Sequence, residues 1–115
     1  MSTRCNILVR GRGRNITLYH HHDGYPEGVG LDLKRRFFEK DWNAYAFANA
    51  LVKDTEDEYE VCFAIDSDID YLYIVDFDKR EIRCFYVDPK DFTFDGKIDA
   101  RIICQSKNRR EIPEE

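Results

Sequence analysis

Two short runs rich in β-branched and aromatic residues open the chain. "CNILVRG" (residues 5–11) and "NITLYHHH" (15–22) lie on either side of "RGRGR" (10–14). Residues of this kind favour strands, and Gly11 and Gly13 can adopt the positive φ values that a tight connection needs. The pattern predicts a β-hairpin at the start of the chain.

A helical pattern follows between about Asp32 and Val52. The apolar positions at helical spacing are Phe37, Phe38, Trp42, Tyr45, Ala48 and Leu51. Lys34, Arg35, Glu39 and Lys40 occupy the other side. Asp32 suits an N-cap or a first-turn acid, and "DTEDE" (54–58) ends the pattern. The spacing predicts one helix over this range.

Three further runs have the composition of strands. They are "YEVCFAI" (59–65), "YLYIVDF" (71–77) and "EIRCFYV" (81–87), separated by the turn-forming "DSDID" (66–70) and "DKR" (78–80). We predict that they form an antiparallel meander. In the middle run both alternating faces are apolar, which indicates a central strand covered on both sides or a second face used for contact.

The remaining segments complete an α+β domain. "DFTFDGKIDARIICQ" (91–105) can add one more strand, and the polar tail from about residue 106 is predicted to be frayed. The order β-β-α-β-β-β, over a single domain of residues 1–115, predicts an antiparallel sheet with one main helix packed across it.

Composition narrows the class of protein. The chain is 43% hydrophobic and 14% aromatic, which favours a folded domain over a disordered one. No stretch approaches the roughly 20 apolar residues of a membrane span, and the N-terminus lacks the features of a signal peptide. We therefore expect a cytoplasmic protein without a membrane partner.

The four cysteines suggest core packing. Cys5, Cys62, Cys84 and Cys104 form no CxxC pair and have no zinc-type spacing. In a reducing compartment they would remain thiols, and we predict that they fill small spaces in the core. The sequence predicts no cofactor.

The net charge of -5 conceals an uneven distribution. Residues 1–14 contain four arginines and no acid, whereas residues 54–78 contain ten acids and no Lys or Arg. The overall acidity makes nucleic acid an unexpected partner. RNA binding through Arg10, Arg12 and Arg14 remains an alternative, because "RGRGR" is similar to arginine-glycine segments that bind RNA.

"YHHHDGYPEGVG" (19–30) is the stretch with the most candidate chemistry. In an extended strand Tyr19, His21 and Asp23 would share one side, and His20 and His22 the other. His21 beside Asp23 would be an imidazole oriented for acid-base chemistry. His20 and His22 form a His-x-His pair, but the sequence offers no reliable third ligand, and a zinc site needs at least three.

The same loop also admits a purely structural interpretation. Asp23 before Gly24 favours a turn, Pro26 fixes its own φ, and the later glycines let the backbone reverse before the helix. Catalysis would add Tyr25 to His21 and Asp23 and give a small hydrolase-like enzyme. The glycine spacing matches neither GxGxxG nor the P-loop, so a nucleotide site is not predicted.

The acidic stretch supplies a candidate contact surface. Asp66, Asp68 and Asp70 have the spacing of the first EF-hand ligands, but Tyr71 stands where that loop needs glycine. A charged turn is the better interpretation. With Tyr71 and Tyr73 on the neighbouring strand, these acids form a predicted surface for binding a protein.

The loop also carries a resemblance. Tyr19, His21, Asp23, Gly24, Tyr25, Pro26 and Gly28 match a Y-x-H-x-D-G-Y-P-x-G motif. This motif, together with "DIDYLYIV" (68–75), resembles small, mostly uncharacterised proteins found in phages, prophages and bacterial mobile elements. The resemblance implies an accessory protein that binds and blocks a host factor or a defence complex, as anti-CRISPR proteins do.

The first functional hypothesis is therefore a non-catalytic protein-binding protein whose partner is a host or defence protein. Its binding residues would be Tyr19, His21, Asp23, Tyr25, Asp66, Asp68, Asp70, Tyr71 and Tyr73. A homodimer formed through the apolar second face of the sheet is compatible with the same pattern.

Overall fold

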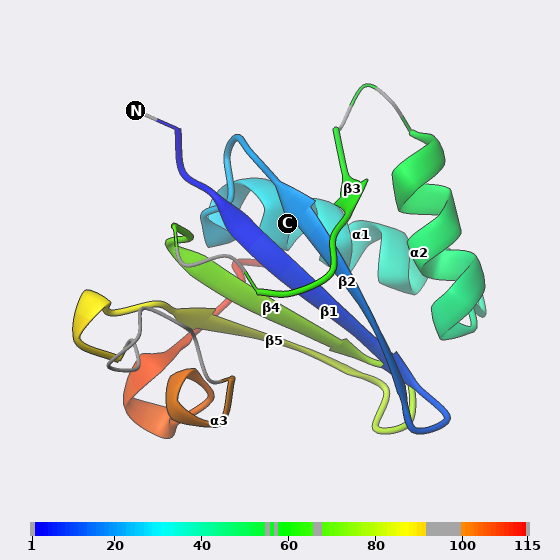
Figure 1. Cartoon of the computed structure of the whole chain (residues 1–115). Helices are drawn as coiled ribbons and strands as arrows, with labels where there is room; N and C mark the ends of the chain where they lie inside the picture. Colours follow the sequence, from blue (N-terminus) through cyan, green and yellow to red (C-terminus); the bar gives the residue numbers. More distant parts are fainter. Residues whose placement is uncertain (1, 55, 57, 66–67, 92–99, 115) are drawn as a thin grey trace.

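The computed structural model describes residues 2–54, 56, 58–65, 68–91 and 100–114. Its strands are β1 (Cys5–Gly11), β2 (Arg14–His20), β3 (Glu60–Val61), β4 (Tyr71–Asp76), β5 (Glu81–Tyr86) and β6 (Arg109–Arg110). Over the described residues they form one sheet in the order β3-β2-β1-β4-β5-β6 (Figure 1). With the helices packed on it, this sheet gives the predicted α+β fold.

The N-terminal hairpin is confirmed. β1 and β2 pair in antiparallel orientation from Cys5 opposite His20 to Gly11 opposite Arg14. The two turn residues are Arg12 (φ 54°) and Gly13 (φ 72°), as a two-residue hairpin turn requires. The prediction of a positive φ at Gly11 is wrong: a Cβ there would lie 2.8 Å from the Cβ of Ala44, so Gly11 permits close packing instead.

The strand pairing differs from the predicted antiparallel sheet in two places. β1 and β4 are parallel, from Cys5 opposite Tyr71 to Arg10 opposite Asp76. β4 and β5 form the expected antiparallel hairpin, but β3 pairs with β2 at the far edge, so the three-strand meander is wrong. Parallel strands are usually covered on both faces, which is why β1 and β4 are apolar almost throughout.

The single predicted helix is two helices. A π-helical turn (Pro26–Gly30) leads into α1 (Leu31–Glu39), and α2 (Ala44–Lys53) follows a break. At the break Lys40 is extended, and the Asn43 side chain accepts a hydrogen bond from the Ala46 N–H at 2.8 Å. The Trp42 indole N–H donates to the Arg36 carbonyl at 2.8 Å. These caps end α1 and begin α2.

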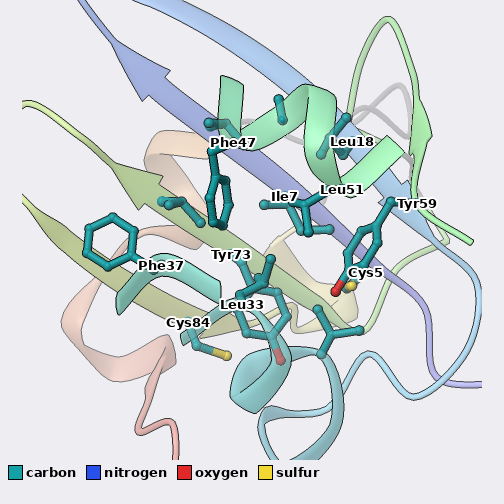
Figure 2. Packing of buried hydrophobic residues seen from close by; sticks show 14 residues of the cluster. Cys5, Ile7, Leu18, Leu33, Phe37, Phe47, Leu51, Tyr59, Tyr73 and Cys84 are labelled. Atoms are coloured by element: carbon teal, nitrogen blue, oxygen red, sulfur yellow. The ribbon is translucent and has the colours of Figure 1, made fainter. Parts of the chain in front are cut away.

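Two apolar clusters cover the two faces of the sheet. α1 and α2 pack on one face, where the cluster in Figure 2 includes Leu33, Phe37, Phe47, Leu51 and Tyr73. On the other face the cluster includes Leu8, Leu72, Ile74, Phe85 and Ile103. The alternating apolar faces of β4 enter the two clusters separately. The prediction of a central strand covered on both sides is therefore confirmed.

The C-terminal region departs from its predictions. Residues 92–99 lie outside the described part of the chain, and Ala100–Ile103 form the short helix α3 rather than a strand. A 3₁₀ turn (Ser106–Asn108) follows, and β6 pairs with β5. Asn108 is buried, and Ile112 packs against the helix-side cluster. The tail is thus part of the fold as far as Ile112 and is not frayed there.

The cysteines are free thiols with different exposure. Cys5 and Cys84 are buried in β1 and β5, as core fillers are expected to be, and Cys62 and Cys104 are partly exposed. Burial raises the pKa of the Cys84 thiol to about 12, so this thiol stays protonated near neutral pH.

Candidate functional site

His20 and His22, the candidate metal ligands, lie in different surroundings. The His20 ring is buried 4.6 Å from the ring of Tyr59, and its Nδ1 has no hydrogen-bond partner among the described residues. His22 is exposed, with Nδ1 3.1 Å from Ser2 Oγ and Nε2 3.7 Å from a Glu58 carboxylate oxygen. In the described part of the chain, no three His, Cys, Asp or Glu side chains are grouped to bind a metal.

The catalytic candidates have partners other than each other. His21 Nδ1 lies 2.8 Å from the Tyr19 hydroxyl, and the Tyr25 hydroxyl donates to Asp23 Oδ1 at 3.1 Å. This bond to the carboxylate raises the pKa of Tyr25, which keeps its hydroxyl protonated. Among the described residues no hydrogen bond joins His21 to Asp23. The imidazole and carboxylate therefore do not form the pair that acid-base catalysis would use.

The backbone of the same loop has a structural reason for its composition. Asp23 adopts φ 54°, and its carbonyl accepts a hydrogen bond from the Val29 N–H at 2.8 Å. A Cβ on Gly28 would lie 2.3 Å from that carbonyl oxygen. The Gly24 N–H donates to the Thr3 carbonyl at 2.9 Å, and a Cβ there would again be too close. The motif thus folds a strand end tightly onto a helix start.

Tyr73 and Tyr71 do not form the predicted exposed face. Tyr73 is 0% exposed in the helix-side cluster (Figure 2), and its hydroxyl donates to the Gly24 carbonyl at 2.7 Å. Tyr71 is partly buried and packs against Tyr86, with ring centroids 5.8 Å apart. Tyr73 therefore anchors the loop and cannot contact a partner without unfolding.

Much of the acidic stretch is also occupied within the fold. Asp66 lies outside the described residues. Arg4 forms an ion pair with Asp68, and its backbone N–H donates to Asp70 at 3.1 Å. Asp76 is buried and accepts hydrogen bonds from two N–H groups of the turn that follows it. These contacts join β1 to β4 and shape the β4–β5 turn.

A groove of about 820 Å³ lies where the tip of the β1–β2 hairpin meets the start of α2. Figure 1 shows the backbone of these two elements. Its apolar lining comes from the sheet and from the helix break: Val9, Ile16, Trp42 and Phe77. These side chains belong to the edge of the helix-side cluster, which is open at this point. A hollow of this size and lining is typical of a binding site.

Arginines and an exposed tyrosine form the rim of the groove. Arg12, Arg14, Arg80 and Tyr45 line it, and Tyr45 is 77% exposed. Arg80 forms an ion pair of 2.5 Å with Asp41. In the part of the chain that the structure describes, Arg12 and Arg14 are exposed and no carboxylate pairs with their guanidinium groups. The arginines of the rim can therefore bind a negatively charged group next to the apolar side chains of the groove.

This groove was not predicted from the sequence. The helical spacing placed Trp42 and Tyr45 on the core side of one continuous helix, and the break at residues 40–43 turns them toward the hairpin instead. The sequence indicates Arg12 and Arg14 as hairpin charges or as part of an RNA-binding segment, without the apolar residues that lie beside them in the groove. Arg10 does not line the groove, because it alternates with Val9 along β1 and so lies on the same face as Leu8, on the other side of the sheet.

Comparison of the chain with protein-family models, curated proteins and solved structures finds no match. Within the described residues, no helix has both the length and the apolar character that a membrane crossing requires.

Proposed function

We propose that the protein is a small non-catalytic binding protein whose contact surface for another protein is the groove at the hairpin tip. One observation supports this most directly: Tyr45 is exposed above an apolar floor, beside two arginines without carboxylate partners among the described residues. Tyr, Trp and Arg are the residue types that dominate binding energy at protein interfaces. Water displaced from such a floor contributes to affinity, and the arginines orient the partner.

This proposal relocates the contact surface expected from the sequence. The burial of Tyr73 removes the aromatic strand face, and Arg4 already pairs with Asp68. The groove has what that surface lacks, namely the exposed side chain of Tyr45 and two arginines, Arg12 and Arg14, whose guanidinium groups have no carboxylate partner among the described residues. The loop from Tyr19 to Gly30 then supports the fold.

The resemblance of the loop motif suggests the biological setting. As an accessory protein of the phage or mobile-element type, the protein would act by occupying a surface of a host or defence protein and so inhibit it. It would work in the cytoplasm of the host cell.

The test is capture of a partner from bacterial lysate by the immobilised protein and by two double variants. Arg14→Ser with Tyr45→Ser removes a cation and an aromatic ring from the groove. Lys53→Ser with Phe63→Ser removes the same kinds of group from exposed positions outside it. Circular dichroism and thermal unfolding first establish that all three proteins are folded.

We expect the wild type and the outside variant to retain the same protein, and the groove variant to lose it. Loss of one aromatic and one arginine contact should weaken binding by at least about 2 kcal/mol, or roughly 30-fold. Equal capture by all three proteins would contradict the proposal, as would capture of nothing.

RNA binding is the second candidate, because two arginines with no carboxylate partner in the described part of the chain lie beside an exposed tyrosine on which a base can stack. Filter binding of a single-stranded oligonucleotide at low and moderate salt tests it. Affinity that falls steeply with salt and depends on Arg14 would support RNA as the partner. Affinity that is absent at low salt would exclude it.

A further inference from the structure

The outer edge of β2 is open toward the hairpin tip. β3 pairs with β2 at Leu18 and Tyr19, and the Cys62 N–H donates to the Thr17 carbonyl at 3.0 Å. Beyond Thr17, no strand among the described residues pairs with this edge. β3 therefore covers only the second half of β2.

The register shows which N–H and C=O groups of β2 point to the edge that β3 does not cover. In an antiparallel ladder the N–H and C=O of one residue point to the same side, and successive residues alternate. The Thr17 carbonyl faces β3, so the N–H and C=O of Asn15 also face the outer edge. Asn15 is exposed. A backbone N–H and C=O that no neighbouring strand binds can form hydrogen bonds with another extended chain.

This open edge belongs to the groove. Asn15 and Ile16 are part of its lining, so the edge, the apolar floor and the arginine rim form one surface. Arg12, Arg14 and Arg80 line the groove together with the carboxylate of Asp78. Because Arg80 is paired with Asp41, the charges left to meet a ligand are Arg12 and Arg14 against Asp78. The surface is locally positive on a chain whose net charge is -5.

We propose that this surface binds an extended, acidic peptide segment of the partner, which adds a strand to β2 at Asn15. The inference rests on the proposed function as a protein-binding protein. The peptide backbone would exchange hydrogen bonds with Asn15, and alternate side chains would lie over the groove. Acidic side chains would meet Arg12 and Arg14, and an apolar one would cover the floor at Trp42.

The observations favour a peptide over a nucleic acid as occupant. A long polyanion would meet the repulsion of the net negative charge outside the groove, whereas a short acidic segment meets only the groove, where Arg12 and Arg14 outnumber Asp78. The strand edge offers a donor and an acceptor in the spacing of a peptide backbone. The apolar floor matches a buried side chain.

The probe is the fluorescein-labelled peptide Thr-Glu-Thr-Phe-Thr-Glu-Thr, whose alternation places Glu, Phe and Glu on one face. Two N-methylated forms of it are compared, one methylated at the threonines and one at the other three residues. A strand on an edge points only one of these two sets of N–H groups at its neighbour. The measurement is fluorescence anisotropy with the wild-type protein and with the groove double variant Arg14→Ser/Tyr45→Ser.

We expect the unmodified peptide and one methylated form to bind, and the other methylated form to bind at least about tenfold more weakly. The groove variant should weaken binding by a similar factor, and a peptide with Lys in place of Glu should not bind. Similar affinity of both methylated forms would overturn strand addition. A uridine oligonucleotide that binds more tightly than the peptide would assign the surface to RNA instead.

Absence of peptide binding would also overturn this inference, but it would leave the proposed function to be judged separately. If the lysate partner still depends on Arg14 and Tyr45, the groove binds a protein by another mode. If that dependence is absent too, both the proposed function and the inference fail.

Discussion

The hydroxyl of Tyr73 provides the sharpest test of what the Tyr19–Gly30 loop does. It is fully buried and donates to the carbonyl of Gly24 at 2.7 Å. Tyr73→Phe keeps the ring in the core and removes only the oxygen. The Gly24 carbonyl then loses a buried donor, which should cost about 1–3 kcal/mol.

For a chain of 115 residues, about 1–3 kcal/mol corresponds to a fall in Tm of roughly 4–12 °C. Urea unfolding followed by circular dichroism measures the free energy directly, with an unchanged slope showing that the unfolded state is the same. Tyr71→Phe is the matched control, since it removes a partly exposed hydroxyl from the same strand and should change stability by less than about 0.5 kcal/mol. If the two variants were equally stable, Tyr73 would not anchor the loop.

Three further changes test other parts of the structure. Gly28→Ala should destabilise by about 1–3 kcal/mol in urea unfolding, because its Cβ would lie 2.3 Å from the Asp23 carbonyl oxygen. Asn43→Ala removes the cap on the Ala46 N–H and should cost about 0.5–2 kcal/mol; a smaller change would contradict the assigned helix break. Because the pKa of Cys84 is raised from 9.0 to about 12, its contribution to stability is complete below pH 9 and is lost between pH 9 and 12. Cys84→Ala should therefore lose less stability over that pH range than the wild type does.

Local signals in the sequence predicted the elements that depend on neighbouring residues. The hairpin follows from a short turn between strand-forming runs, and Gly13 has the positive φ predicted for it, whereas the second such residue is Arg12 and not Gly11. The apolar character of both faces of residues 71–77 predicted a doubly covered strand, and β4 contributes to both clusters. These features need only the alternation of side chains along a strand.

The predictions that were wrong concern features that depend on contacts between residues far apart in the sequence. The ring of Trp42 continues the helical spacing, but its indole N–H bonds to the Arg36 carbonyl and closes α1. The parallel pairing of β1 with β4 joins residues more than 60 positions apart, which local periodicity cannot report. Because the groove exists only through that helix break and the hairpin packed beside it, its residues could not be grouped from the sequence.

In the Tyr19–Gly30 loop, too, the features set by neighbouring residues were predictable and those set by distant contacts were not. The turn residues Asp23, Gly24 and Gly28 were recognised correctly as turn formers, and their close contacts explain why. The contact of His21 with Tyr19 agrees with the predicted shared side of the strand. The contacts of His20 with Tyr59 and of His22 with Glu58 were not predictable, because they join residues more than 30 positions apart.

The central claim is that the groove, and not the histidine loop or the acidic turn, contacts the partner. Hydrogen–deuterium exchange of the protein alone and with its captured partner examines all three surfaces at once. The proposal predicts slower exchange on partner binding in residues 11–16 and 42–46, with no change at 19–30 or 68–71. Protection confined to 19–30 or to 68–71 would contradict it.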